Sequence, residues 1–113
     1  MPRQDQDGAS MEDRMRGDLK QAMKDRDAAA TVALRTALAA IANAEAVPDD
    51  GSLAPTHGRL VDHPRRVLTP DDVRAIVRHQ IDDRRDTIGQ IAAHGGATDD
   101  LSAQIDVLER YLT

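Results

Sequence analysis

Residues 35–47 read RTALAAIANAEAV, and six of these thirteen residues are alanine. Alanine is the residue most easily placed in a helix, and its small side chain lets neighbouring helices come close. At 100° per residue, the apolar residues here and just upstream fall on one face. These residues are Ala30, Leu34, Ala37, Leu38 and Ile41. The pattern predicts a central packing helix that is capped by Asp27 and ends near Val47, before Pro48.

The composition indicates that the other elements are also helices. The chain has 113 residues, enough for one domain, and 40% of them are hydrophobic. It contains one Tyr and no Phe or Trp, so the core must be aliphatic. Sheets favour β-branched and aromatic residues, whereas Leu, Met and Ala suit packing of helix against helix.

Three further helices are predicted from periodicity and caps. The first begins at Ser10, after a disordered tail over residues 1–9, and the fourth begins at Thr98. The third begins at TPDD, with Thr69 as the cap and Pro70 in the first turn, and glycines end it after His94. The apolar stripes of these three helices are Met11, Met15, Leu19, Ala22 and Met23; Val73, Val77, Ile81, Arg84, Ile88 and Ile91; and Leu101, Ile105, Leu108 and Leu112.

The predicted fold is therefore all-α, a four-helix bundle of two hairpins in a single domain over residues 10–113. Residues 48–68 are rich in Pro, Gly and polar side chains without a period, and we expect an irregular loop between the second and third helices. No internal repeat and no convincing strand is found in the sequence.

The charge and the cysteine count exclude several classes of protein. The net charge is −5, and residues 69–113 hold nine acidic residues against five arginines, which disfavours binding to tRNA or DNA through phosphates. There are no cysteines, so disulfides and thiolate metal sites are excluded. No apolar run reaches the roughly 20 residues that cross a bilayer, and the polar start is unlike a signal peptide. We expect a cytoplasmic protein that does not enter membranes.

Arg84 interrupts the apolar face of the third helix and needs a partner. In an antiparallel hairpin closed near residues 95–96, residue 84 lies opposite residues 108 and 109. We therefore predict an ion pair between Arg84 and Glu109, helped by Asp106 near Arg85. A partly buried pair of this kind sets the register of the helices; the alternative is a catalytic or ligand-binding role.

Two other charged residues lie on or beside the stripe of the alanine-rich helix. Glu45, in the last turn, is expected to reach solvent; the alternative is contact with a partner. Arg35 is expected either to pair with Asp18 or to face a partner.

No catalytic constellation, cofactor motif or metal site is predicted. His57, Asp62 and His63 share the long loop, but their spacing matches no known ligand pattern. No Ser or Thr has a histidine and an acid at suggestive positions, and HGGAT follows no strand as a phosphate loop would.

Four segments, in this order and spacing, resemble the GatB/YqeY family, and together they extend over about residues 18–112. They are DLKQAMKDRD (18–27), ALRTALAAIANAEAV (33–47), LTPDDVRAIVRHQIDDRRDTIGQI (68–91) and LERYLT (108–113). The positions that match the family, with no role assigned to them, are Leu34, Arg35, Glu45, Arg84, Arg85, Leu108, Glu109 and Leu112.

The resemblance implies a short, stand-alone relative of the tail of GatB, a subunit of tRNA-dependent amidotransferases. The activity at family level would be that of a carbon–nitrogen ligase with glutamine as amido donor, but the chemistry of that enzyme resides in other domains. Longer members read YLP and continue, whereas this sequence ends Tyr111–Leu112–Thr113, and the 48–68 loop has no counterpart in them. The segment that follows YLP in longer members is the part most comparable to the GatB tail, so its absence here weakens the expected link to tRNA.

Two functions remain open at this point. The chain is either an accessory or adapter module of tRNA-dependent amidotransferase, or a helical protein-interaction module unconnected with it. Because a small aliphatic domain buries little area alone, we also expect a homodimer formed through an exposed apolar strip near Val32, Leu53 or Val107.

Overall fold

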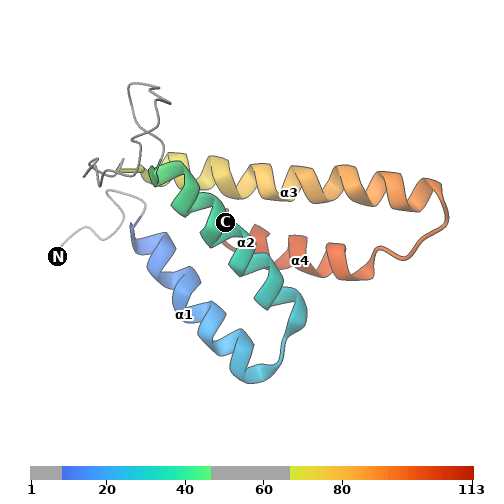
Figure 1. Ribbon diagram of the computed structural model, residues 1–113, viewed down its shortest axis with the longest axis horizontal. Coiled ribbons are helices and arrows are strands. Elements are labelled where there is room, and N and C mark those ends of the chain that lie inside the picture. Colours follow the sequence, from blue (N-terminus) through green and yellow to red (C-terminus); the bar gives the residue numbers. More distant parts are fainter. Residues whose placement is uncertain (1–8, 47–66) are drawn as a thin grey trace, which may run out of the picture.

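The computed structural model describes residues 9–46 and 67–113, which form four α-helices (Figure 1). These are α1 (Ala9–Asp25), α2 (Ala28–Ala46), α3 (Pro70–Ala93) and α4 (Asp99–Glu109). No strand occurs within these two ranges. The all-α, four-helix prediction is confirmed.

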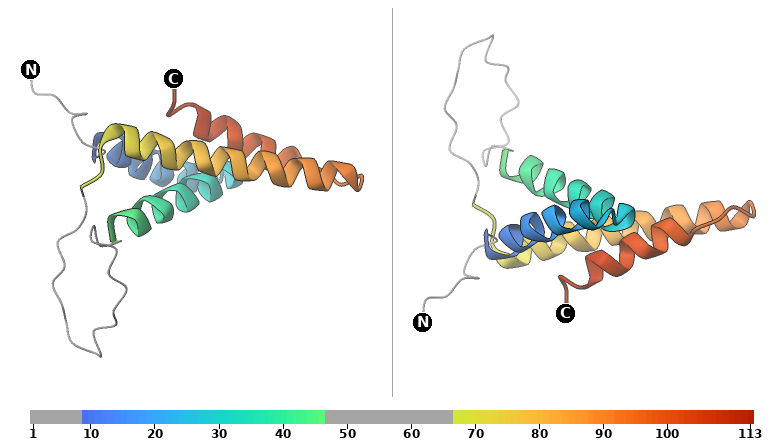
Figure 2. Two further views of the ribbon diagram at one scale, coloured as in Figure 1. Left: turned by 90° about the horizontal axis from the view of Figure 1, so that it is seen from above. Right: turned by 90° about the horizontal axis from the view of Figure 1, so that it is seen from below.

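The helices pair as two antiparallel hairpins, α1–α2 and α3–α4, whose turns point in different directions (Figures 1 and 2). The start of α1, the end of α2 and the start of α3 lie at one end of the molecule. Helix α2 packs against each of the other three helices; α3 does so as well, but its contact with α1 is the smallest in the bundle. The alanine-rich helix is therefore the central packing element, as its composition predicts.

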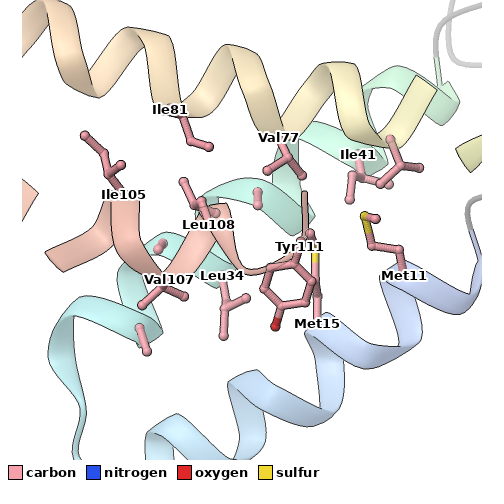
Figure 3. Packing of buried hydrophobic residues seen from close by; sticks show 14 of the residues in the cluster. Met11, Met15, Leu34, Ile41, Val77, Ile81, Ile105, Val107, Leu108 and Tyr111 are labelled. Atoms are coloured by element: carbon pink, nitrogen blue, oxygen red, sulfur yellow. The ribbon is translucent and has the colours of Figure 1, made fainter. Parts of the chain in front are cut away.

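The core is built on the predicted face of α2. Ala30, Ala33, Leu34, Ala37 and Ile41 are all buried. Around them pack side chains from the other three helices, as Figure 3 shows. The labelled ones are Met11, Met15, Val77, Ile81, Ile105, Val107, Leu108 and Tyr111. Three small alanines in this face bring the partner helices close to the α2 backbone.

The predicted apolar stripes of α3 and α4 are only partly buried where these helices extend beyond the other two. Ile88 and Ile91 of α3 and Leu101 of α4 are only partly buried. They lie toward the α3–α4 turn, which projects beyond the α1–α2 hairpin (Figure 1). Met23, near the end of α1, is 51% exposed, so its predicted place in the core is wrong.

Five buried residues were not in the predicted stripes: Glu12, Ala33, Leu68, Val107 and Tyr111. Leu68 was placed in the irregular loop, yet it packs in the core just before α3. Val107 and Tyr111 flank the predicted stripe of the last helix. They are buried because α4 packs against both α2 and α3, which widens its covered face.

Local signals set the helix ends. The Thr69 hydroxyl accepts a hydrogen bond from the Asp72 amide at 3.0 Å, and the Asp72 carboxylate accepts one from the Thr69 amide at 2.9 Å. This capping box satisfies two amides at the start of α3. Asp27 caps α2 by accepting from the Ala30 amide at 3.1 Å.

Two turn residues have positive φ angles. Gly95, after α3, has φ +78°, which glycine adopts without steric penalty. Arg26, between α1 and α2, has φ +57°, a left-handed conformation that costs a non-glycine residue roughly 1 kcal/mol. The sequence gives no indication of this second feature, because arginine is not a typical residue for such a position.

The predicted boundaries need one small correction. Helix α1 begins at Ala9, within the predicted tail, rather than at Ser10. Residues 1–8 and 47–66, which hold the rest of the predicted tail and most of the predicted loop, lie outside the described residues.

The capping box gives a stability prediction with a matched control. Thr69→Ala removes the side-chain cap of α3 and should lower the free energy of unfolding by about 1 kcal/mol. Thr98, at the start of α4, makes no side-chain cap hydrogen bond, so Thr98→Ala should change it by less than about 0.5 kcal/mol. Urea unfolding followed by circular dichroism measures both. Equal losses would show that the Thr69 hydroxyl does not stabilise α3.

Candidate functional site

A buried arginine joins three helices. Arg84 of α3 is only 9% exposed. Its Nε donates to Gln104 Oε1 of α4 at 2.8 Å, and its Nη2 donates to Thr36 Oγ1 of α2 at 2.7 Å. Its Nη1 donates to both the carbonyl and the side-chain oxygen of Gln80, each at 3.1 Å. The Thr36 hydroxyl in turn donates to the Ala33 carbonyl at 3.0 Å.

The acceptors around Arg84 are neutral oxygens. Burial lowers the pKa of Arg84, and the negative charge of Asp83, which precedes it on α3, offsets part of that effect. A guanidinium remains charged in proteins. Loss of any one acceptor would therefore leave a buried N–H donor without a hydrogen bond, which lowers the free energy of unfolding. The cluster of Arg84, Gln104, Gln80 and Thr36 therefore fixes how α2, α3 and α4 meet.

The predicted ion pair between Arg84 and Glu109 is not present, and Glu109 pairs with Arg85 instead. Glu109 accepts from Arg85 Nη2 at 2.7 Å, not from Arg84. The register of the hairpin was predicted correctly, but Arg84 points into the junction with α2, whereas Arg85 lies on the outer surface where half-exposed Glu109 can reach it. Arg85 Nη1 also lies 4.0 Å from the Asp82 carboxylate, and not beside the predicted Asp106.

Glu45 contacts the carboxyl group of Glu12 rather than only solvent. It is half-buried and forms a hydrogen bond with the Glu12 side chain of α1. Burial is the main cause that raises the pKa of Glu12, and the charge and hydrogen bond of Glu45 raise it further, while Arg16 lowers it. A raised pKa means that the folded state holds this proton more tightly than the unfolded state. The resulting stabilisation is present below the ordinary carboxyl pKa and declines as the pH rises through the raised value.

Arg35 does not pair with Asp18. Its Nη2 lies 3.9 Å from the Met23 sulfur, across the α1–α2 hairpin, and the side chain is exposed. Asp18 instead accepts a hydrogen bond from the Tyr111 hydroxyl. Contact of Arg35 with a partner stays a prediction.

Tyr111, the one aromatic residue, ties the end of the chain to α1. Its ring is buried next to Met15, and its hydroxyl points toward α1, as Figure 3 shows. The Arg14 guanidinium lies 5.0 Å from the centre of the ring. Burial and the hydrogen bond to Asp18 raise the pKa of Tyr111 well above its ordinary range, so the phenol stays protonated and acts as a donor. The sequence did not suggest this contact, because 93 residues separate its partners.

An open cavity lies beside this contact. It has a volume of about 220 Å³ and sits between the turn of the α1–α2 hairpin and the end of α4. Its lining combines acidic and amide side chains with an apolar wall. The lining residues are Asp18, Gln21, Ala22, Asp25, Asp27, Ala30, Leu34, Val107, Arg110 and Tyr111.

The predicted apolar strip is only partly present. Val32 is 44% exposed, as expected, but Val107 is 5% exposed and faces the core because α4 packs against α2. Leu53 lies outside the described residues.

The described histidines make local contacts. His79 Nδ1 lies 3.3 Å from Asp83, and His94 Nδ1 lies 2.9 Å from the Gln90 carbonyl oxygen. Within residues 9–46 and 67–113, no three His, Asp or Glu side chains are placed to hold a metal ion. His57, Asp62 and His63 lie outside those ranges.

Comparison with known proteins gives no relative on which to base a function. No family model, no curated protein and no solved structure matches the chain. None of the helices in the described part of the chain has an apolar stretch long enough to cross a membrane.

Two adjacent arginines provide a test of this account. Arg84→Ala should lower the free energy of unfolding by about 2–4 kcal/mol, because three helices lose a shared set of charged hydrogen bonds. Arg85→Ala removes an exposed ion pair and should cost less than about 1 kcal/mol. Denaturant unfolding measures both variants. If the two losses are alike, the Arg84 cluster does not hold the helices together.

Proposed function

We propose that this chain is a helical accessory module that acts by binding another protein, in the manner of GatB/YqeY-like modules that serve tRNA-dependent amidotransferase. The observation that supports the proposal is that the buried polar side chains of the described residues form hydrogen bonds within the fold. The buried polar residues described above, Arg84, Glu12 and Tyr111, all bond to other helices or to their own. Among the described residues, these three buried polar side chains thus take part in contacts that maintain the fold.

The outer surface offers contacts that a partner could use. Met23 and Val32 are large apolar side chains that are about half exposed on the first hairpin. Arg35 lies against Met23 and is also exposed. Methionine and arginine are enriched in protein–protein interfaces relative to the rest of the protein surface.

The link to amidotransferase rests on the resemblance of the four helical segments in the sequence. Charge favours the protein over the tRNA as the partner, because the chain has a net charge of −5. The alternative is a helical interaction module with no amidotransferase partner, in which self-association through the apolar side chains Met23 and Val32 provides the contact.

The direct test mixes the purified chain with purified tRNA-dependent amidotransferase, and separately with tRNA, and measures binding by isothermal titration calorimetry. The proposal predicts a saturable complex with the enzyme and weak, strongly salt-dependent binding to tRNA. Arg35→Glu should weaken the complex, while Arg78→Glu, a charge change on the exposed face of α3, should affect it less.

Absence of binding to the enzyme at low and at physiological salt would contradict the amidotransferase link. Light scattering over a concentration series then decides the alternative. A rise in mass that Val32→Asp abolishes would support self-association, whereas a constant monomer mass would contradict it.

A further inference from the structure

The cavity between the first hairpin and the end of α4 combines two kinds of surface. Its wall is apolar, and its rim carries three carboxylates from α1 and the turn that follows it. The wall residues are Ala22, Ala30, Leu34 and Val107, and the carboxylates are Asp18, Asp25 and Asp27. The aliphatic stem and cationic head of a lysine or arginine side chain match such a surface.

The carboxylates at the rim differ in how the fold uses them. Asp27 caps α2, and Asp18 accepts from Tyr111. Asp25 accepts only a surface hydrogen bond, from Gln21 at 3.0 Å, among the contacts described for it. Asp25 is also the last residue of α1, where the partial negative charge of the helix end disfavours a carboxylate. Capping and stability therefore do not explain why an acid stands there.

The helix ends add to the negative potential of the cavity. Both α1 and α4 end beside it, at Asp25 and Glu109, so their carbonyl ends face the same region. The positive end of α2 is offset by the Asp27 cap. Arg110 is the one basic residue of the lining, against three carboxylates. Lys24, near the end of α1, and Arg26, just after it, do not line the cavity.

The size of the cavity limits what can occupy it. Pockets for drug-sized ligands measure roughly 300–1,000 Å³, whereas this one is about 220 Å³. It is large enough for a single long side chain. The exposed positions of Asp18, Asp25 and Asp27 leave it open for insertion of such a side chain from outside.

We propose that this cavity is the docking site for one lysine or arginine side chain of a partner protein, with the stem against Leu34 and Val107 and the cationic head among Asp18, Asp25 and Asp27. The inference rests on the proposed function only in that the chain acts by contact with another protein. It does not require that the partner be an amidotransferase.

The experiment is a titration of the ¹⁵N-labelled 113-residue chain with Nα-acetyl-lysine N-methylamide, monitored by two-dimensional NMR. Nα-acetyl-arginine N-methylamide is the second probe, and Nα-acetyl-norleucine N-methylamide is the neutral control. The backbone signals of Ala22, Ala30 and Val107 should shift with one of the basic probes, at millimolar concentration. The neutral probe should leave them unchanged, and added salt should weaken the effect.

Matched variants distinguish binding in the cavity from general electrostatic attraction of a cation to an acidic protein. Asp25→Asn should weaken binding of the basic probe about three- to tenfold, because it removes a charge at the rim. Asp86→Asn removes an exposed charge on α3, away from the cavity lining, and should leave binding unchanged. Asp18→Asn keeps an oxygen that can accept from Tyr111 and should weaken binding as Asp25→Asn does. Circular dichroism checks that each variant is folded.

Several results would overturn the inference. They are equal shifts with norleucine, equal loss of binding in Asp25→Asn and Asp86→Asn, or shifts spread over other acidic surfaces. Shifts of the cavity signals on raising the protein concentration alone would identify a second copy of this chain as the occupant. Tighter binding of spermidine than of either basic probe would identify a free polyamine.

This test is independent of the amidotransferase titration. Binding of the basic probe without binding of the enzyme would support the docking cavity and contradict the amidotransferase as partner. Binding of the enzyme without any probe at the cavity would retain the partner and reject the cavity.

Discussion

The close packing of α2 against three helices at once is the constraint on which the rest of the structure depends. Ala30, Ala33 and Ala37 present little more than backbone to their neighbours, so α1, α3 and α4 can all approach the same helix. Larger residues fill the spaces that remain, chiefly Leu34, Ile41 and the side chains shown in Figure 3. A domain with one aromatic residue obtains a closed core in this way, because interiors are stabilised by dense contact rather than by ring size alone.

Polar contacts between helices then select one arrangement of these apolar surfaces. Aliphatic faces slide past each other with little change in energy, whereas Arg84 finds its acceptors on α2 and α4 in a single geometry. The hydrogen bond from the Tyr111 hydroxyl to Asp18 likewise fixes the position of residue 111 against α1. Because these buried groups maintain the fold, the groups left for the proposed contacts lie on the surface: the exposed side chains of the first hairpin and the acidic cavity beside its turn.

The sequence predicts well what depends on local periodicity and caps, and poorly what depends on distant segments. The four helices and the Asp27 and Thr69 caps follow from spacing within one helix, whereas the spacing of the α3–α4 hairpin assigned Glu109 to Arg84 rather than to its neighbour Arg85. The partners of Arg84 could not be predicted in this way, because Thr36 belongs to the other hairpin. The cavity was missed for the same reason: its acidic rim and its Val107 wall come from opposite ends of the chain.

The most direct test of the central claim is to enlarge one buried alanine of α2. Ala37→Leu adds a side chain where the described fold leaves no exposed surface, and it should lower the free energy of unfolding by about 1–3 kcal/mol. Ala39→Leu makes the same change on the exposed face of α2 and should change it by less than about 0.5 kcal/mol. Urea unfolding monitored by circular dichroism compares the two. If Ala37→Leu is as stable as the unmodified chain, the helices are not held at close range by the small face of α2, and the account is wrong.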